Sequence, residues 1–250
     1  MSSPVLQTHG LVRRFGGFVA TDNVDLSIAP GARHALIGPN GAGKTTLINL
    51  LTGYLEPSEG RVELMGRDVT CMPQHERARL GLVRTFQINQ LFMDMTVLES
   101  VALAVSERNG LGTSWWKPLA VRGEVIDEAA SILERLKLLS DAHETTRNLA
   151  YGRQRLIEIA LALALRPTVL LLDEPAAGVP TGESQELFET IAQLPRDVTI
   201  LLIEHDMNLV FRFAERISVL VSGALLLEDT PEVIAHHPRV KEVYLGEAHV

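Results

Sequence analysis

The chain has 250 residues, enough for one large globular domain or for one domain that carries an inserted subdomain. Hydrophobic residues make up 46% of it and charged residues 22%, which excludes a mainly disordered chain. Its formal net charge of -8 gives no general attraction to phosphate backbones, so nucleic acid is not expected as a partner. The single cysteine, Cys71, can form no internal disulfide and is expected to be a spectator thiol.

The apolar runs are too short for a membrane span, and the first residues do not have the pattern of a signal peptide. We therefore expect a chain that neither enters nor crosses a membrane alone. Docking onto a membrane protein remains open.

Two kinds of apolar pattern predict two kinds of strand. Around residues 24–28 and 61–64, apolar and polar residues alternate, as in half-exposed strands, which predicts an antiparallel layer near the N-terminus. Unbroken apolar runs at residues 35–37, 169–172 and 200–203 are typical of parallel strands covered on both faces. The core is therefore predicted to be α/β.

A helical insertion is predicted over about residues 89–154, because apolar residues from Ile126 to Leu136 recur at helical spacing. Trp115 and Trp116 fall in a loop of this region, where they either shield its interior or anchor an interface. The stretch from Pro231 through Tyr244 is predicted to form one terminal amphipathic helix. The adjacent His236 and His237 are interpreted as surface residues, because neighbours on a helix point apart.

A glycine-rich phosphate-binding loop is the first motif that carries chemistry. Residues 38–45, GPNGAGKT, match G-x-x-x-x-G-K-[ST] between an apolar strand and a helix-compatible segment. The glycines let backbone N–H groups surround an anion, and the start of the helix adds partial positive charge. Lys44 is predicted to bridge the outer phosphates of a nucleotide, and Thr45 to hold Mg²⁺.

Two acidic residues follow the apolar run at residues 169–172, at the carboxyl end where ligands of parallel sheets collect. Asp173 is predicted to bind Mg²⁺ through water, and Glu174 to orient and polarise the attacking water. His205 follows another apolar strand and could donate a hydrogen bond to the γ-phosphate. Gln87, at the junction with the insertion, could contact Mg²⁺ or water.

These elements, in this order, resemble the ATP-binding cassette (ABC) ATPases over essentially the whole chain. The resemblance includes a signature loop, residues 149–154 (LAYGRQ), just before the Asp-Glu strand. It implies a P-loop NTPase (RecA-like) core, about residues 1–88 and 155–250, with an N-terminal antiparallel β layer and an inserted α-helical subdomain. The whole of residues 1–250 would then form a single nucleotide-binding domain.

The resemblance also implies a head-to-tail dimer that holds two ATP molecules, each between the phosphate loop of one subunit and the signature loop of the other. Phe15 falls where family members stack an aromatic ring on adenine. The alternatives are that Phe15 is a core residue, or that Phe18 stacks on adenine in its place. The catalytic residues implied are Lys44, Gln87, Glu174 and His205, with Thr45, Gln87 and Asp173 toward Mg²⁺. Nucleotide contacts are implied for Phe15, Gly38, Pro39, Asn40, Gly41, Ala42, Gly43, Lys44, Thr45 and Thr46, and in trans for Ala150, Tyr151, Gly152 and Arg153.

Finer features resemble the ATPase subunits of branched-chain amino-acid and related amide or urea importers. They are RTFQ around Gln87, the tyrosine in the signature loop, PAAG after Glu174, and VKEVYLG near the end. The resemblance implies a peripheral protein on the cytoplasmic face of the cell membrane, with permease subunits, a second ATPase subunit and, indirectly, a solute-binding protein as partners. Gln87 and residues 88–97 are the predicted groove for the permease. The alternatives are a lipid or lipopolysaccharide exporter and a soluble ABC switch protein.

Three residues depart from the family pattern. Ala150 replaces the signature serine, Arg153 replaces Gln or Glu, and Pro180 replaces Asp or Asn after the Asp-Glu strand. Loss of the serine hydroxyl is expected to weaken contact with the partner's nucleotide by about 1.5–3 kcal/mol. The charge of Arg153 either compensates in part or is merely solvated. These departures favour an asymmetric heterodimer over a homodimer.

Overall fold

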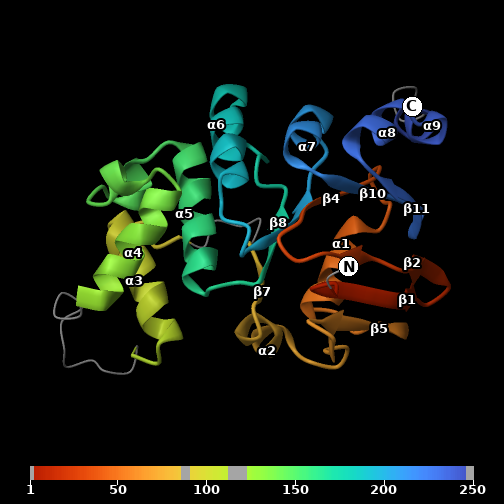
Figure 1. The fold of residues 1–250 in the computed structure, drawn as a ribbon, viewed down its shortest axis with the longest axis horizontal. Helices are drawn as coiled ribbons and strands as arrows, with labels where there is room; N and C mark the ends of the chain where they lie inside the picture. Colours follow the sequence, from red (N-terminus) through yellow and green to blue (C-terminus); the bar gives the residue numbers. More distant parts are fainter. Residues whose placement is uncertain (1–2, 86–90, 112–122, 246–250) are drawn as a thin grey trace. The chain divides into compact units, whose positions relative to one another are not determined.

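The computed structural model describes residues 3–85, 91–111 and 123–245 and divides the chain into two compact units (Figure 1). The first comprises Met1–Arg84, Thr168–Glu174 and Arg196–Val250. The second comprises Thr85–Pro167 and Pro175–Pro195.

An antiparallel sheet forms one layer of the first unit, with strand order β2-β1-β5-β6 and β3 paired with β1. Its alternating pattern follows from burial of one face only, since Val62 and Leu64 are fully buried while Arg61 is exposed. The predicted antiparallel layer near the N-terminus is confirmed, but residues 24–28 are divided between the end of β2 and β3 and do not form one strand. Its strands are β1 (Leu6–Phe15), β2 (Phe18–Val24), β3 (Ser27–Ile28), β5 (Glu59–Leu64) and β6 (Arg67–Asp68).

The second sheet of this unit has the order β11-β10-β4-β9-β8-β7 and is parallel except for the β10–β11 pair. Every residue of β4, β8 and β9 is buried, as the unbroken apolar runs predicted. The α/β fold is confirmed. The strands are β4 (Arg33–Ile37), β7 (Leu82–Arg84), β8 (Val169–Asp173), β9 (Thr199–Ile203), β10 (Arg216–Val221) and β11 (Ala224–Asp229).

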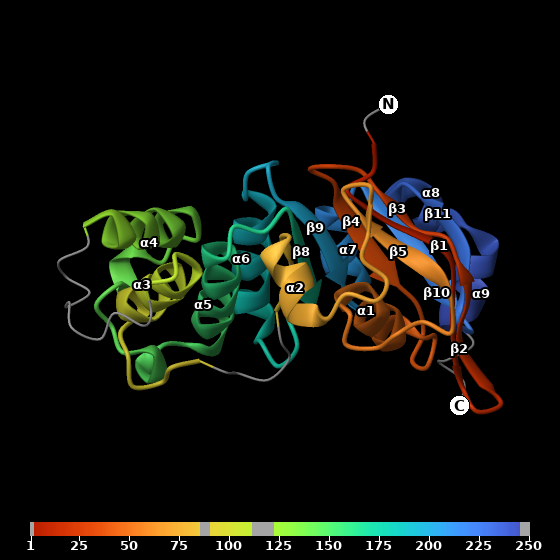
Figure 2. The ribbon, with the colours of Figure 1, turned by 90° about the horizontal axis from the view of Figure 1, so that it is seen from below.

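Helix α1 (Lys44–Thr52) contributes to the same apolar core as both sheets. Leu47, Ile48 and Leu51 are fully buried together with residues of β1, β5, β8 and β9. Figure 2 shows α8 and α9 beside β10 and β11, and α8 contacts both strands. The remaining helices of this unit are α2 (Gln74–Arg79), α7 (Met207–Phe213), α8 (Pro231–His236) and α9 (Pro238–Leu245).

The prediction of one terminal helix was wrong, because the chain forms α8 and α9 instead. Pro238 has no N–H with which to continue α8 and begins α9, while His237 has the extended backbone favoured before a proline. His236 is exposed, and its Nδ1 lies 2.9 Å from the Glu232 carbonyl oxygen.

The second unit is helical. Helix α4 buries Val125, Ala129, Ile132 and Leu133 on one face, which keeps the predicted helical spacing, although Ile126, the first residue of the predicted pattern, is only half-buried. Figure 1 shows α3, α4 and α5 side by side, and all three contact one another. The elements are α3 (Val97–Arg108), α4 (Gly123–Arg135), two short 3-10 helices η2 (Leu139–Asp141) and η3 (Thr146–Asn148), α5 (Tyr151–Ala164) and α6 (Thr181–Ala192).

The boundaries of this helical unit differ from the predicted insertion over about residues 89–154. The unit also includes the whole of α5. After the chain has formed β8 in the first unit, it returns to the helical unit and forms α6. The reason is packing, because α5 contacts α3 and α4 on one side and α6 on another. Trp115 and Trp116 lie outside the described residues.

None of the described helices is both long and apolar enough to cross a membrane. No group of three or more His, Cys, Asp or Glu side chains among residues 3–85, 91–111 and 123–245 could hold a metal ion. Cys71 is exposed and forms no disulfide.

Candidate functional site: a phosphate loop at the edge of the parallel sheet

Three neighbouring parallel strands bring the predicted catalytic segments to one edge of the sheet. Strand β9 lies between β4 and β8, and Ile203 is in register with both Leu36 and Asp173. The glycine-rich loop follows β4, Glu174 follows β8, and His205 follows β9. The backbone N–H of Glu174 also donates to the carbonyl of Ile203, with N and O 2.9 Å apart. All three segments therefore emerge at the same level of the sheet.

Two glycines of the loop occupy positions where a side chain has no room. A Cβ on Gly38 would lie 2.1 Å from the carbonyl oxygen of Leu220. Gly43 has φ +99°, and a Cβ there would lie 2.3 Å from the carbonyl oxygen of Ala20. The tight packing beneath the loop fixes its course before helix α1 begins at Lys44.

Lys44 folds back over this loop. Its Nζ donates hydrogen bonds to the carbonyl oxygens of Gly38, at 2.6 Å, and of Pro39, at 3.0 Å. The first turn of α1 contains no acidic residue to neutralise its positive end, and Thr45 in that turn is exposed. Backbone amides, an ammonium and a helix N-terminus together suit a phosphate chain.

Asp173 and Glu174 differ in their surroundings. Asp173 is buried, with 7% of its surface exposed, and its carboxylate is paired with the guanidinium of Arg84. Glu174 is half-buried and has φ +49°, an uncommon conformation for a residue with a side chain. That conformation ends the strand at Asp173.

His205 stands on the sheet edge with 67% of its side chain exposed. Its backbone N–H donates to the Glu204 carboxylate at 3.0 Å, and its Nδ1 lies 3.7 Å from the same carboxylate oxygen. Asp206 then caps α7 by accepting from the backbone N–H groups of Asn208 and Leu209. The histidine backbone is thus held while its ring faces solvent.

Phe15 and Phe18 face each other across the β1–β2 turn and are 45% and 64% exposed. The alternative that Phe15 is a core residue is wrong, because β1 has left the core by this point. The guanidinium carbon of Arg13 lies 4.7 Å from the centre of the Phe15 ring. Adenine stacking on Phe15 stays a prediction, and Phe18 stays the competing candidate.

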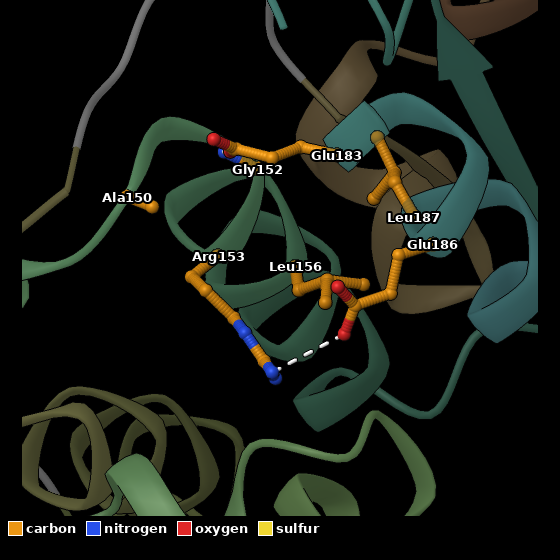
Figure 3. Close-up of a pocket in the computed structure, with 7 residues that line it drawn as sticks. All are labelled: Ala150, Gly152, Arg153, Leu156, Glu183, Glu186 and Leu187. Atoms are coloured by element: carbon orange, nitrogen blue, oxygen red, sulfur yellow. Dashed lines mark hydrogen bonds and ion pairs between the residues drawn. The ribbon is translucent and has the colours of Figure 1, made fainter. Parts of the chain in front are cut away.

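The signature loop begins helix α5 in the second unit. Ala150 is the N-cap residue and supplies no side-chain hydrogen bond. Instead, the backbone N–H of Gly152 donates to a carboxylate oxygen of Glu183, 2.8 Å away. Figure 3 shows Glu183 beside Gly152 at the start of this helix, on a cavity of about 140 Å³.

The other two residues that depart from the family pattern, Arg153 and Pro180, lie at the starts of α5 and α6. Arg153 points toward Glu186 (Figure 3), with Nη2 and Oε1 3.2 Å apart, and donates from Nη1 to the Lys137 carbonyl at 2.8 Å. It is therefore paired within its own unit, and the interpretation that its charge is merely solvated is wrong. Pro180 is exposed and forms the N-cap of α6.

Arg155 organises the residues behind the signature loop. Its Nη2 donates to the Tyr151 hydroxyl at 2.8 Å and to the Ala177 carbonyl at 3.3 Å, while Nη1 donates to Glu158. Burial raises the pKa of the Glu158 carboxyl, and the bond from Arg155 partly offsets this shift. Tyr151 is thereby held against the segment that follows Glu174.

The residues present fit magnesium and a nucleotide. Asp173 offers a carboxylate and Thr45 an exposed hydroxyl, both oxygen ligands suited to Mg²⁺. Mg²⁺ in such sites takes few protein ligands and relies on phosphate oxygens and water, which agrees with the small number of donors here. Gln87, the third predicted magnesium contact, lies outside the described residues.

Comparison with known proteins decides the family. A family model described as ABC transporter matches residues 21–177. The high-affinity branched-chain amino acid transport ATP-binding protein LivG of Escherichia coli is 46% identical over 255 residues, covering 99% of this chain and 100% of LivG. This chain belongs to the ABC transporter ATP-binding proteins. As a member of that family it is an ATPase.

Further matches agree with this ABC family. BraF of Pseudomonas aeruginosa, named as a high-affinity branched-chain amino acid transport ATP-binding protein, is 43% identical over 99% of this chain and 100% of BraF. A crystal structure of the ADP conformation of MJ1267, an ATP-binding cassette of an ABC transporter, has TM-score 0.85 and 34% identity, covering 98% of this chain and all of that one. A model described as branched-chain amino acid ATP-binding cassette transporter matches residues 224–250.

Sequence reasoning missed Arg84, Arg155 and Glu183 as neighbours of the ABC motifs. Arg84 had a usable signal, because a charged residue at the end of an apolar run calls for a partner. Glu183 had none, since an acidic residue in the first turn of a helix is common on its own account.

Proposed function

We propose that this chain is the ATP-hydrolysing subunit of an importer of branched-chain amino acids, bound to membrane permease subunits on the cytoplasmic face of the membrane. The observation that carries the proposal is the end-to-end similarity to LivG, together with the match of residues 224–250 to the branched-chain amino acid cassette model. That terminal match favours this cargo over lipid or lipopolysaccharide export.

In the proposed reaction, the loop amides and Lys44 bind the phosphates of ATP. Glu174 orients and polarises the water that attacks the γ-phosphate, and the His205 imidazole donates a hydrogen bond toward that phosphate. Mg²⁺, held by Thr45 and Asp173, supplies charge neutralisation on the phosphate oxygens when it is bound. Gln87 and residues 88–97 are proposed to contact the permease and report the nucleotide state to it.

We further infer an asymmetric heterodimer with a second ATPase subunit. The support comes from the three residues of this chain that depart from the family pattern. Ala150 offers no hydroxyl, Arg153 is engaged by Glu186, and Pro180 offers no polar side chain to a partner. The Lys44 to Glu174 set of this chain is complete, so the site built on its phosphate loop is proposed as the active one, and the site that uses its signature loop as the weaker one.

Uptake of radiolabelled leucine by the native cells tests the cargo and the chemistry together. Deleting this chain should abolish uptake, wild type should restore it, and Glu174→Gln should fail to restore it while still binding ATP, with ATPase activity about 10²–10⁴-fold lower. Leucine uptake that survives the deletion would overturn the cargo. ATPase activity of the purified transporter that survives Glu174→Gln would overturn the role of this subunit, and the equivalent substitution in the second subunit should be the milder one.

Co-purification tests the partners. The tagged subunit, extracted from native membranes in mild detergent with Mg²⁺ and nucleotide, should bring down two multi-pass permease chains and a different ATPase subunit. Recovery of this chain as the sole ATPase would contradict the heterodimer. Recovery of lipid-export components would contradict the importer.

A further inference from the structure

Arg84 and Asp173 form an ion pair between two adjacent strand ends. Strands β7 and β8 are parallel neighbours with Arg84 in register with Leu171, so Asp173 lies two residues further along its strand. The Arg84 guanidinium Nη2 is paired with Oδ2 of Asp173. The two side chains are 14% and 6% exposed, so this pair is largely removed from water.

The second arm of the same guanidinium reaches helix α1. Arg84 Nη1 donates a hydrogen bond to Oδ1 of Asn49, with N and O 2.7 Å apart. Asn49 is four residues after Thr45, which places the two side chains on one face of α1. One planar guanidinium therefore joins the helix that carries Thr45 to the strand that ends in Asp173, the two proposed holders of Mg²⁺.

Stability alone is a weak reason for this arrangement. Burying an ion pair costs desolvation energy that an apolar pair of similar volume would not incur. The Nε of Arg84 is buried, and no group in the described part of the chain accepts a hydrogen bond from it, which adds to the cost of burying this side chain. The pair is better explained by the position that it gives to Asp173.

We propose that Arg84 is a positioning residue for the magnesium ion of the nucleotide site. The proposal rests on the proposed function. By holding Oδ2, Arg84 fixes the orientation of the Asp173 carboxylate and leaves Oδ1 for the water shell of the metal. By holding Asn49, it sets the distance between that carboxylate and the face of α1 that carries Thr45. A lysine cannot replace it, because an ammonium on a flexible stem does not present the two parallel N–H groups of a fork.

The test measures metal binding apart from catalysis. Binding of Mn²⁺, in place of Mg²⁺, is followed by electron paramagnetic resonance in the presence of the non-hydrolysable analogue AMP-PNP. Binding of fluorescent mant-ATP is measured separately in EDTA. Arg84→Met should weaken Mn²⁺ binding about tenfold, the size expected from losing one charge-assisted hydrogen bond, and leave mant-ATP affinity in EDTA within about twofold of wild type. Arg84→Lys should resemble Arg84→Met.

Two further variants make the result decisive. Asn49→Ala removes only the hydrogen bond from Arg84 Nη1 and should weaken Mn²⁺ binding by a smaller factor. This variant decides the question by itself if Arg84→Met does not fold. Arg61→Met, which removes an exposed arginine paired with Glu63 on β5, is the matched control and should leave Mn²⁺ binding unchanged. Circular dichroism melting confirms that each variant is folded.

The outcomes separate the two proposals. Unchanged or tighter Mn²⁺ binding in Arg84→Met, with wild-type mant-ATP binding, would overturn the positioning role, because Arg84 would then be a spectator or a competitor of the metal. Absence of both Mn²⁺ and mant-ATP binding in the wild-type protein would instead overturn the proposed function.

Discussion

The carboxylate of Glu183 accepts a hydrogen bond from the backbone N–H of Gly152, at 2.8 Å. Each residue lies in the first turn of a different helix, Gly152 in α5 and Glu183 in α6. One negative charge thus lies near the positive ends of two helices, where it is favourable for both. Gly152 permits the approach, because a Cβ there would lie 2.8 Å from the same carboxylate oxygen.

Replacing Glu183 should therefore destabilise the helical unit. We expect Glu183→Ala to lower the free energy of unfolding by about 1–2 kcal/mol, because it leaves the amide of Gly152 without this acceptor. Glu183→Gln keeps an acceptor oxygen and should cost less than half as much. Urea unfolding measures both. Glu189→Ala, at an exposed position of the same helix, is the control, and an equal effect at Glu189 would contradict the prediction.

A buried arginine closes the end of helix α1. Arg77 is 1% exposed and donates to four carbonyl oxygens at 2.6–2.8 Å, those of Leu50, Leu51, Thr70 and Met72. Burial lowers the pKa of its guanidinium to about 10, which still leaves it charged at neutral pH. The helix that begins at the phosphate loop is thus anchored at its other end by one side chain.

Arg77→Met should lower the free energy of unfolding by about 3 kcal/mol or more, because the four carbonyl groups would lose the guanidinium as a donor, although that of Leu50 would keep the N–H of Gly53. Arg79 is an exposed residue of α2, the helix that also carries Arg77. Arg79→Met should change the free energy of unfolding by less than about 0.5 kcal/mol. Chemical denaturation of the two variants makes the comparison. A loss for Arg77→Met as small as that for Arg79→Met would mean that water satisfies these carbonyl groups.

The sheets and the phosphate loop could be predicted from sequence because their signals are local. The run at residues 169–172 is apolar because both faces of β8 are covered, and the phosphate loop is recognised from consecutive residues, although its glycines at 38 and 43 are required by the carbonyl oxygens of Leu220 and Ala20. The similarity of this chain to ABC ATPases follows from several such local signals in a fixed order.

What could not be predicted depends on contacts between distant segments. The pairing of Arg84 with Asp173 requires β7 to lie beside β8, and nothing in the three residues of β7 selects that neighbour. Likewise, α6 joins the helical unit because it packs on α5. The break at Pro238 was a local signal, and the amphipathic pattern on either side of it obscured it.

Arg153 is linked to Glu186 and Asp141 by ion pairs of 3.2 and 3.6 Å, all on partly exposed side chains. Water screens such pairs, so Arg153→Gln should cost less than about 1 kcal/mol of stability. A double-mutant cycle of Arg153→Gln with Glu186→Gln, measured by urea unfolding, should give a coupling free energy below about 1 kcal/mol. A coupling above about 2 kcal/mol would show that these ion pairs act as a buried network.

His34 is the buried group that should make stability depend on pH. It is 2% exposed on β4, and its Nε2 lies 2.8 Å from the Ser218 hydroxyl, which donates to Glu228 on β11. Burial lowers the pKa of His34 to about 4, against the opposing effect of the Glu228 carboxylate and with a smaller contribution from Arg216. The imidazole is therefore neutral in the folded protein at neutral pH.

The sign of the pH dependence follows from this lowered pKa. The unfolded chain takes up the His34 proton near pH 6.5, whereas the folded chain does so only near pH 4, so the contribution of His34 is fully present above about pH 6.5 and is lost as the pH falls toward 4. The loss should reach about 3 kcal/mol. Its measure is the difference in unfolding free energy between wild type and His34→Gln, which should shrink by that amount from about pH 7 to about pH 4. A difference that stays constant, or one that shrinks equally for the exposed control His143→Gln, would contradict the assignment to His34.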